Sequence, residues 1–189
     1  MKYCSTRGSA PHIDFDDVLL TGLANDGGLY IPHKWPSFSE SEINNMQGMT
    51  YGELATEIVQ PFTEGSLIQE DLKKLILETY KSFSHSDVAP LRNIKKNIWI
   101  MELYHGPSLS FKDYALQVIG NIFESLLLKK NKTINIVGAT SGDTGSAAIS
   151  SCANRSGMNI FILHPEGRVS EVQRRQMTTV NSSNVFNIA

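Results

Sequence analysis

The sequence predicts an α/β protein in which a mainly helical N-terminal region precedes a parallel sheet covered by helices. Three patterns support this. Apolar residues recur at helical spacing in the first ninety residues, strands and helices alternate from about residue 97, and the strand segments are short apolar runs typical of buried parallel strands. We therefore expect one domain over residues 1–90 and a second over 91–189. The last segment, 184–189, also has the pattern of a strand, so either the domain ends on a strand or the sequence is cut there.

The composition suits a folded protein that acts on a small molecule. The chain has 189 residues, of which 41% are hydrophobic and 19% are charged, so it can bury a sizeable core. A formal charge of -2 without a run of Lys or Arg gives no electrostatic basis for nucleic-acid binding, and no stretch approaches the roughly 20 apolar residues of a membrane span. We expect a small polar substrate, with neither nucleic acid nor membrane as a partner.

The two cysteines, Cys4 and Cys152, lie far apart, and no CxxC motif or Cys/His array accompanies them. This spacing favours neither a disulfide framework nor a metal site. Residues 1–7 also lack the apolar core of a secretion signal. We expect two free thiols, no bound metal and a cytoplasmic protein.

A first helix is predicted to begin after Asp14, which is a common N-cap residue. Its apolar residues are Phe15, Val18, Leu19 and Leu20. Two consecutive glycines, at 27–28, are expected to end this segment, and a short extended stretch, 29–32, follows them.

Two more helices are predicted in the N-terminal region. Thr50 and Glu53 have the spacing of a capping box, and Pro61 is expected to close the helix that they open. Ser66 and Gln69 have the same spacing and are expected to open the next helix. Its apolar residues at helical spacing are Ile68, Leu72, Leu75, Ile76 and Tyr80.

The C-terminal half alternates strands with helices, which favours a parallel sheet. Strands are predicted over 97–103, 133–137, 159–163 and 184–189. Helices are expected after residues 112 and 145 and over about 170–179. The first of these would bury a stripe formed by Phe111, Tyr114, Ala115, Val118, Ile119, Ile122 and Leu126.

Lys112 follows a strand-like run and a His-Gly-Pro-Ser turn, 105–108, where a long amphipathic segment opens. A neutral lysine amine held in such a turn can attack a carbonyl and form a Schiff base. The positive end of the helix dipole slightly disfavours a cation at this place, which favours the neutral amine. The spacing alone is better explained by a capping box of Ser110 and Asp113 beside a solvated Lys112.

The turn at 138–146 carries three glycines and four hydroxyl residues between a strand and a helix. Backbone N–H groups at the helix start, together with the hydroxyls of Thr140, Ser141 and Thr144, can hold a phosphate or a carboxylate. A plain strand-to-helix turn capped by Asp143 or Thr144 explains the segment equally well. The turn lacks the ending of a Walker A loop and the GxGxxG pattern, so nucleotide binding is only weakly indicated.

Three other basic residues are weaker candidates. His164 and Arg168 follow the strand at 159–163, at the end where open α/β sheets bind their ligands, so either could meet an anion. A surface turn in which Ser170 caps a basic helix explains these residues more simply. Arg7 could bind phosphate, but a lone arginine near a chain end is usually solvated.

Five segments, taken together and in this order, resemble threonine synthase. This is a pyridoxal-phosphate enzyme of the fold-type II group, which also contains the tryptophan synthase β chains. The segments span nearly the whole chain, and the lysine segment together with Ser-Gly-Asp-Thr-Gly at 141–145 is quite specific. They are residues 3–8, 22–32, 105–113, 139–146 and 164–170.

The resemblance implies that Lys112 carries pyridoxal 5'-phosphate as a Schiff base and moves protons after the substrate amine displaces it. It implies a carbon–oxygen lyase that converts O-phospho-L-homoserine and water to L-threonine and phosphate. The turn formed by Ser141, Gly142, Asp143 and Thr144 would hold the substrate carboxylate near the cofactor. On these grounds Lys112 is interpreted as a Schiff-base lysine rather than as part of a simple cap.

The chain departs from the family in two small ways and one large way. Ser108 stands where the family has threonine and Ser110 where it has alanine, and the small side chains should preserve the turn. Family members are more than twice as long, and their later portion holds the loop that grips the cofactor phosphate and the residue that faces the pyridine nitrogen. We expect this chain to be an N-terminal part that holds the cofactor weakly or not at all alone. Its partner would be the missing C-terminal portion or another protomer.

Two other functions fit the residues. The chain could be a truncated, non-catalytic remnant that serves as an interaction module, or a phosphate- or nucleotide-binding domain built on the 138–146 turn. Phosphate release from O-phospho-L-homoserine would separate the lyase from the module. Nucleotide binding without binding of pyridoxal phosphate would favour the third interpretation.

Overall fold

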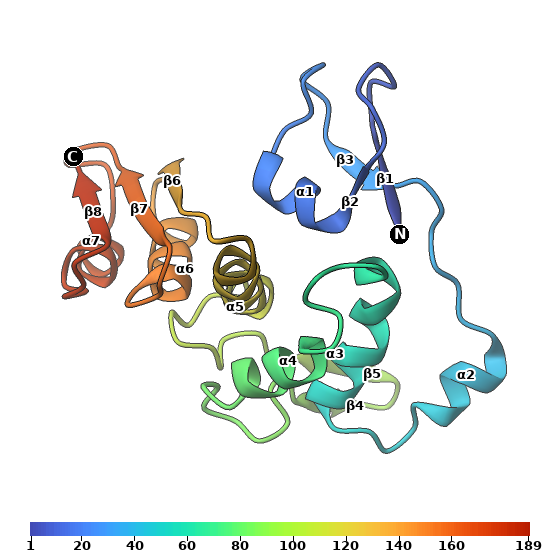
Figure 1. Cartoon of the computed structure of the whole chain (residues 1–189). Coiled ribbons are helices and arrows are strands. Elements are labelled where there is room, and N and C mark those ends of the chain that lie inside the picture. Colours follow the sequence, from blue (N-terminus) through green and yellow to red (C-terminus); the bar gives the residue numbers. More distant parts are fainter. The chain divides into compact units, whose positions relative to one another are not determined.

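The computed structural model describes all 189 residues and divides the chain into two compact units, residues 1–77 and 78–189 (Figure 1). The units are described separately below. The boundary between the two domains that the sequence predicts near residue 90 stays a prediction. None of the helices combines the length and apolarity that a membrane crossing requires.

The first unit begins with a small antiparallel sheet in the order β2-β1-β3. Its strands are β1 (Lys2–Ser5), β2 (Ile13–Asp14) and β3 (Tyr30–Pro32). The extended stretch expected at 29–32 is therefore confirmed as β3, whereas β1 and β2 were not predicted. Strands of two to four residues are too short to show an alternating pattern in the sequence.

Helix α1 (Phe15–Thr21) starts where it was predicted but ends earlier than residues 27–28. Gly22 ends it, because this residue has φ 70° and its N–H donates to the carbonyl of Val18. Asp14 occupies the N-cap position without a side-chain cap bond. Its carboxylate instead pairs with the Lys2 ammonium at 2.8 Å, across β1 and β2.

The other helical elements of the first unit are α2 (Glu40–Asn45), α3 (Tyr51–Val59) and the short 3-10 helix η1 (Gln60–Thr63). The capping box of Thr50 and Glu53 is confirmed, and Pro61 lies in η1, directly after α3. A second box, from Ser39 to Glu42, opens α2 and was not predicted.

Helix α4 (Leu72–Tyr80) begins six residues after the predicted start at Ser66. The predicted box does not form there, because the Ser66 hydroxyl donates to the carboxylate of Asp16 and the Gln69 side chain accepts from the N–H of Gly65. The three apolar side chains that are fully buried in this segment are Ile68, Leu72 and Ile76.

Asp26 organises the loop between α1 and β3. Its carboxylate accepts hydrogen bonds from the Ser5 hydroxyl at 2.7 Å and from the backbone N–H groups of Ser9, Ala10 and Gly28, each at 2.9 Å. These bonds, the one from Ser5 first, lower the pKa of Asp26 from its ordinary value of 3.8 to about 2. An ionised carboxylate thus ties the end of β1 to the segment that leads into β3.

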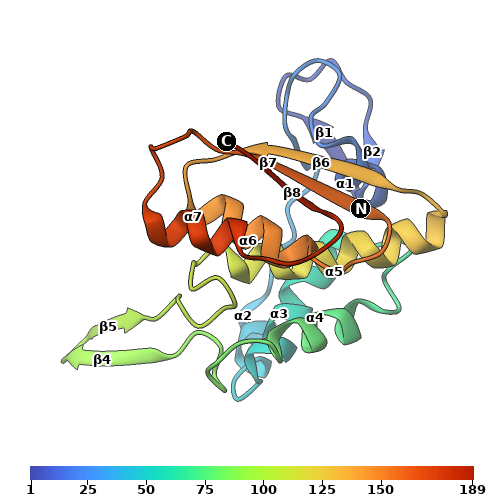
Figure 2. The same cartoon turned by 90° about the vertical axis from the view of Figure 1, so that its left-hand side faces the viewer.

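The second unit opens with an antiparallel hairpin of β4 (Leu91–Lys95) and β5 (Ile98–Met101), all of whose residues are exposed. The strand predicted at 97–103 was expected to lead into the parallel sheet, and this was wrong. The chain reverses at 96–97, where Asn97 has φ 63°, a conformation that asparagine tolerates well. Figure 2 shows the hairpin projecting away from the sheet of its own unit.

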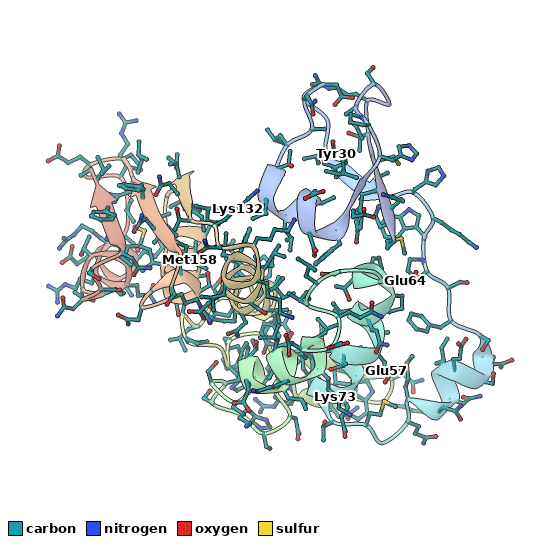
Figure 3. All side chains as sticks on the ribbon, in the orientation of Figure 1. Tyr30, Glu57, Glu64, Lys73, Lys132 and Met158 are labelled. Carbon is teal, nitrogen blue, oxygen red and sulfur yellow. The ribbon has the colours of Figure 1, made fainter.

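The predicted parallel sheet forms from the next strand onward, in the order β6-β7-β8. Its strands are β6 (Ile134–Ala139), β7 (Met158–Leu163) and β8 (Val185–Ile188). Figure 2 shows three helices on one face of this sheet, namely α5 (Asp113–Lys130), α6 (Asp143–Cys152) and α7 (Glu171–Thr178). Figure 3 labels Lys132 and Met158 beside the lower ends of β6 and β7. The alternation of strand and helix is therefore confirmed.

The two faces of the parallel sheet differ. Ile160, Ile162 and the helix residues Ile149 and Met177 are almost completely buried on the helix side. On the other face the side chain of Val137 is 69% exposed. The rings of Phe161 and Phe186 stack there with centroids 4.6 Å apart. One face of the sheet thus forms the core, and the other exposes apolar side chains together with a bonded pair of asparagines, Asn135 and Asn159.

Helix α5 buries a different stripe from the predicted one. Ile122 and Leu126 are buried as expected, but Phe111 is 60% exposed and Ala115 is exposed. The Gln117 side chain instead donates to the Ser150 hydroxyl of α6 at 3.1 Å, and Gly120 lets the helix approach the backbone of Ser151 closely. The residues of α5 that are buried are Asp113, Gln117, Gly120, Ile122, Leu126 and Leu127.

Candidate functional site

Lys112 occupies the N-cap position of α5, with helical dihedral angles of φ −64° and ψ −23°. Its backbone N–H donates to the hydroxyl of Ser110 at 3.3 Å, and its Nζ atom lies 4.6 Å from the centre of the Phe111 ring. The side chain is partly exposed. The amine therefore stands over an aromatic face at the start of an 18-residue helix, open to an approaching molecule.

The capping box expected from Ser110 and Asp113 does not form, because Asp113 turns toward the preceding turn. Its side chain is 0% exposed and accepts two hydrogen bonds from Ser108, one from the backbone N–H and one from the hydroxyl, both at 2.8 Å. A buried carboxylate is tolerated when such bonds satisfy it. Asp113 thus locks the turn at 105–108 onto the first turn of the helix that Lys112 opens.

Gly106 makes this lock possible. A Cβ atom at this position would lie 2.5 Å from Asp113 Oδ2 and would overlap the rest of that carboxylate. The turn continues through Leu109, which has a left-handed φ of 62°. The turn is further tied down at its start, where His105 Nε2 and Glu102 Oε2 are 3.0 Å apart.

The second candidate segment, the loop at 140–145, is open. Ser141, Asp143 and Thr144 are exposed, whereas Gly142 is buried as the N-cap of α6. The alternative of a plain turn capped by Asp143 or Thr144 is wrong in its cap residue, since both residues lie within the helix. The hydroxyl of Thr140 accepts from the N–H of Gly142 at 3.2 Å and so shapes the turn. Ser141 and Thr144 are thus exposed hydroxyl residues beside the start of α6, where the first N–H groups of a helix have no partner within the helix.

Helix α7 contacts both candidate segments. The side chain of Gln173 donates to Asp143 Oδ1 at 2.6 Å, and that of Gln176 donates to the carbonyl of Ser108 at 3.3 Å. Residues three apart lie on the same side of a helix. One face of α7 therefore connects the loop at 140–145 to the turn at 105–112 that contains Lys112, called the lysine turn below. A Cβ atom on Gly142 would overlap the Gln173 amide.

The sequence did not predict this role of α7. Ser170 caps the helix as expected, but the two basic residues that the sequence emphasised, Arg174 and Arg175, both bond to Glu171. The signal that could have identified the contact is the pair of glutamines at 173 and 176. It is weak, because amides at such spacing are common on exposed helices.

A cavity of about 450 Å³ lies at the carboxyl ends of the parallel strands, where sheets of this type bind ligands. His164 contributes to it, and its Nδ1 atom is buried without a hydrogen-bond partner. Arg168, the other candidate anion-binding residue, does not line the cavity. The lining consists of Ala139, Thr140, Ser141, Leu163, His164, Pro165, Ile188 and Ala189.

Two features of the first unit involve none of the residues of these segments. Arg7 is exposed and donates to the carbonyl of Asp26 at 2.8 Å, so it is tied to the Asp26 loop rather than freely solvated. A cavity of about 300 Å³ lies beside α3 and α4, where Figure 3 labels Glu57 and Lys73. No residue that the sequence singled out for binding or catalysis lines this cavity.

Two known protein families match this chain, and together they include all the segments described above. Residues 85–186 match the family described as "Pyridoxal-phosphate dependent enzyme", and residues 2–80 match the one described as "Threonine synthase N terminus". Because the first match covers more than half of the chain, the chain belongs to the family of pyridoxal-phosphate-dependent enzymes. Within this family its whole length is similar to the N-terminal part of threonine synthases.

Individual relatives give the same result. The chain is 53% identical to threonine synthase of Pseudomonas aeruginosa and 42% identical to that of Schizosaccharomyces pombe, over 100% and 98% of its own length. It also matches a PLP-bound threonine synthase from Brucella melitensis, with a TM-score of 0.94 and 46% identity, and the yeast enzyme, with a TM-score of 0.93 and 41% identity. These two matches include 99% and 100% of the residues of this chain, respectively. The chain spans only about two fifths of the length of these relatives.

Proposed function

We propose that this chain supplies the N-terminal part of a threonine synthase, a lyase that converts O-phospho-L-homoserine and water to L-threonine and phosphate. The observation that carries the proposal is the position of Lys112, which a buried carboxylate fixes at the start of α5 in the same unit as an open loop rich in hydroxyls. The similarity to threonine synthases over the whole chain supports it.

The residues present fit pyridoxal 5'-phosphate as the cofactor. The cofactor carries an aldehyde, for which a primary amine on a rigid turn is the required partner, and Lys112 offers such an amine over an exposed ring. When bound, the cofactor takes up the negative charge that develops on the substrate when the proton at its α carbon is removed. Both the amine and the segments that position it come from this chain.

Lys112 has two roles in this proposal. Its amine would hold the cofactor through the cofactor's aldehyde until the substrate binds. Once free of the cofactor, the Lys112 amine would take the proton from the α carbon of the substrate and return protons at later steps. The lock between Asp113 and Ser108 serves this role by fixing the helix start from which the lysine projects.

Ser141, Gly142, Asp143 and Thr144 would bind the carboxylate of the substrate. The hydroxyls of the exposed residues Ser141 and Thr144 and the first N–H groups of α6 are donors suited to an anion. The Gln173 amide holds the Asp143 carboxylate by donating to it. This contact keeps a negative charge at the edge of the loop in a fixed position.

The proposal includes a cytoplasmic location and a small-molecule substrate. Both cysteines are free thiols, as is typical of proteins from reducing compartments. The partner of this chain would be the remaining portion of the enzyme or a second protomer, in line with the share of the relatives that it spans.

A chimera tests the function without relying on the short chain alone. Residues 1–189 would replace the matching N-terminal segment of the Pseudomonas aeruginosa enzyme, to which they are 53% identical. We expect the chimera to release phosphate and L-threonine in equal amounts from O-phospho-L-homoserine. Lys112→Ala should abolish turnover, and Lys96→Ala, in the exposed turn of the hairpin, should leave it unchanged. A folded chimera that binds the cofactor but forms no threonine would support the non-catalytic module instead.

A further inference from the structure

One face of the β2-β1-β3 sheet gathers a thiol and two imidazoles from separate parts of the first unit. Cys4 lies in β1, His12 directly precedes β2 and His33 directly follows β3. The pairing of Tyr3 with Ile13 places Cys4 opposite His12, and the pairing of Cys4 with Ile31 places His33 diagonally across from it. Alternate residues of a strand share a face, so all three side chains point to the side away from Tyr3, which is buried.

The ligand atoms of these side chains are close to one another. The Cys4 sulfur and one ring nitrogen from each histidine all lie within 4.8 Å of each other, and the two rings have centroids 4.6 Å apart. A tetrahedral zinc ion, with bonds of about 2.0–2.3 Å, separates its nitrogen and sulfur ligands by roughly 3.3–3.6 Å. Small rotations of the two exposed histidines would close this difference without moving the strands.

We propose that Cys4, His12 and His33 form a binding site for a divalent transition-metal cation of the zinc type. A thiolate and two imidazoles are the ligands that zinc and cobalt prefer, whereas magnesium and calcium require oxygen ligands. The three protein ligands leave a fourth position for water, because His12 and His33 are exposed.

The neighbouring charges are compatible with a cation. The Lys2 ammonium, which shares this face of the sheet, is paired with the Asp14 carboxylate at 2.8 Å. Metal binding requires the Cys4 thiol to lose its proton to solvent as the sulfur–metal bond forms, with no change in oxidation state. The bound metal would join the three strands of the sheet and so stabilise the first unit.

The site is independent of the proposed enzymatic function. All three ligands belong to the first unit, whereas Lys112 and the loop at 140–145 belong to the second. Metal binding without threonine formation would overturn only the proposed enzymatic function. Threonine formation without metal binding would overturn only the metal site.

Cobalt titration of the reduced 189-residue chain tests the site, because thiolate ligation to Co²⁺ gives a charge-transfer band in the near ultraviolet. We expect this band to saturate at one Co²⁺ per monomeric chain and to disappear when Zn²⁺ displaces the cobalt. Cys4→Ser should abolish the band, and His12→Ala and His33→Ala should each weaken Co²⁺ binding by at least about tenfold. The histidines are exposed, so these two variants should keep the fold, which circular dichroism checks.

Cys152→Ala is the matched control. Cys152 is buried, and this burial raises the pKa of its thiol, so it is a poor metal ligand. The control should keep the cobalt band. The proposal is overturned if the band survives Cys4→Ser, if no band forms at millimolar Co²⁺, or if one Co²⁺ binds two chains in a metal-linked dimer.

Discussion

The lysine turn at 105–112 and the loop at 140–145 belong to the same unit and both connect to the start of a helix, yet they are built in opposite ways. In the lysine turn the carboxylate of Asp113 is fully buried and every hydrogen bond that it accepts comes from Ser108. In the loop the carboxylate of Asp143 is exposed and meets only a side chain from α7.

This difference in burial suits the lysine turn to positioning the Lys112 amine and the loop to binding a ligand. A turn held by a buried charge has little freedom, and it can present the Lys112 amine in one geometry before any ligand arrives. A loop with exposed hydroxyls can exchange bonds with water for bonds to a ligand. The two segments therefore suit the two tasks that the proposed function requires, a fixed covalent anchor and an anion-binding loop.

The same substitution at the two aspartates should give the largest contrast. Asp113→Asn places an NH₂ group against the N–H and hydroxyl of Ser108 and leaves a buried donor unsatisfied, so it should destabilise the chain by about 2–3 kcal/mol. Asp143→Asn keeps the oxygen that accepts from Gln173 and should change stability by less than about 0.5 kcal/mol. Urea unfolding measures both. Equal effects would remove the distinction between the two segments.

Added bulk at Gly106 should have the next largest effect. Gly106→Ala would force the new methyl group into Asp113 and should cost about 1–3 kcal/mol. Gly138→Ala is the matched control, because its methyl group would meet only the flexible end of Ile162, at 3.2 Å. Thermal unfolding should rank Gly106→Ala as clearly the less stable variant, and the reverse order would mean that the turn is not locked.

The two glutamines of α7 should contribute less. Gln173→Ala and Gln176→Ala each remove one hydrogen bond, so each should cost about 0.5–1.5 kcal/mol. Hydrogen exchange should show faster exchange near Gly142 for the first variant and near Ser108 for the second. If neither variant alters local exchange, α7 does not connect the two segments.

Asp26 extends the comparison to a carboxylate lock near the surface of the first unit. Its folded-state pKa of about 2 lies below the ordinary value of 3.8, so its contribution to stability is complete above the ordinary value and is lost as the pH falls through 2. The difference in unfolding free energy between the native chain and Asp26→Asn should therefore shrink as the pH is lowered from 5 to 2. A difference independent of pH would show that the hydrogen bonds do not depend on the charge.

Local patterns predicted part of this structure. The capping box of Thr50 and Glu53, the Ser170 cap and the strand segments from β6 onward were predicted because residues close together in the chain form each of them. The parallel pairing of these strands was inferred from their alternation with helices. The hairpin of β4 and β5 was missed because its place in space depends on a reversal at Asn97. The isolated apolar run at 97–103 looks the same in a hairpin as in a buried strand.

The candidate site shows the same limit. The sequence singled out Lys112 and the residues at 141–144, and their catalytic and binding roles stay predictions. It did not predict the turn of Asp113 toward Ser108, because the local spacing with Ser110 equally allows a capping box. The grouping of Cys4 with two histidines depends on strand register over about thirty residues of chain, which no short motif encodes.

The most direct test of the central claim is to identify the residue that binds the cofactor. The chimera of residues 1–189 with the remaining part of the Pseudomonas aeruginosa enzyme would be saturated with pyridoxal 5'-phosphate, reduced with borohydride, digested and analysed by mass spectrometry, because the chain alone is expected to hold the cofactor weakly or not at all. We predict that the label lies on Lys112 and is lost in Lys112→Ala, while exposed lysines such as Lys96 carry only background label at the same cofactor concentration. Labelling of Lys112 no greater than that of Lys96 would contradict the account.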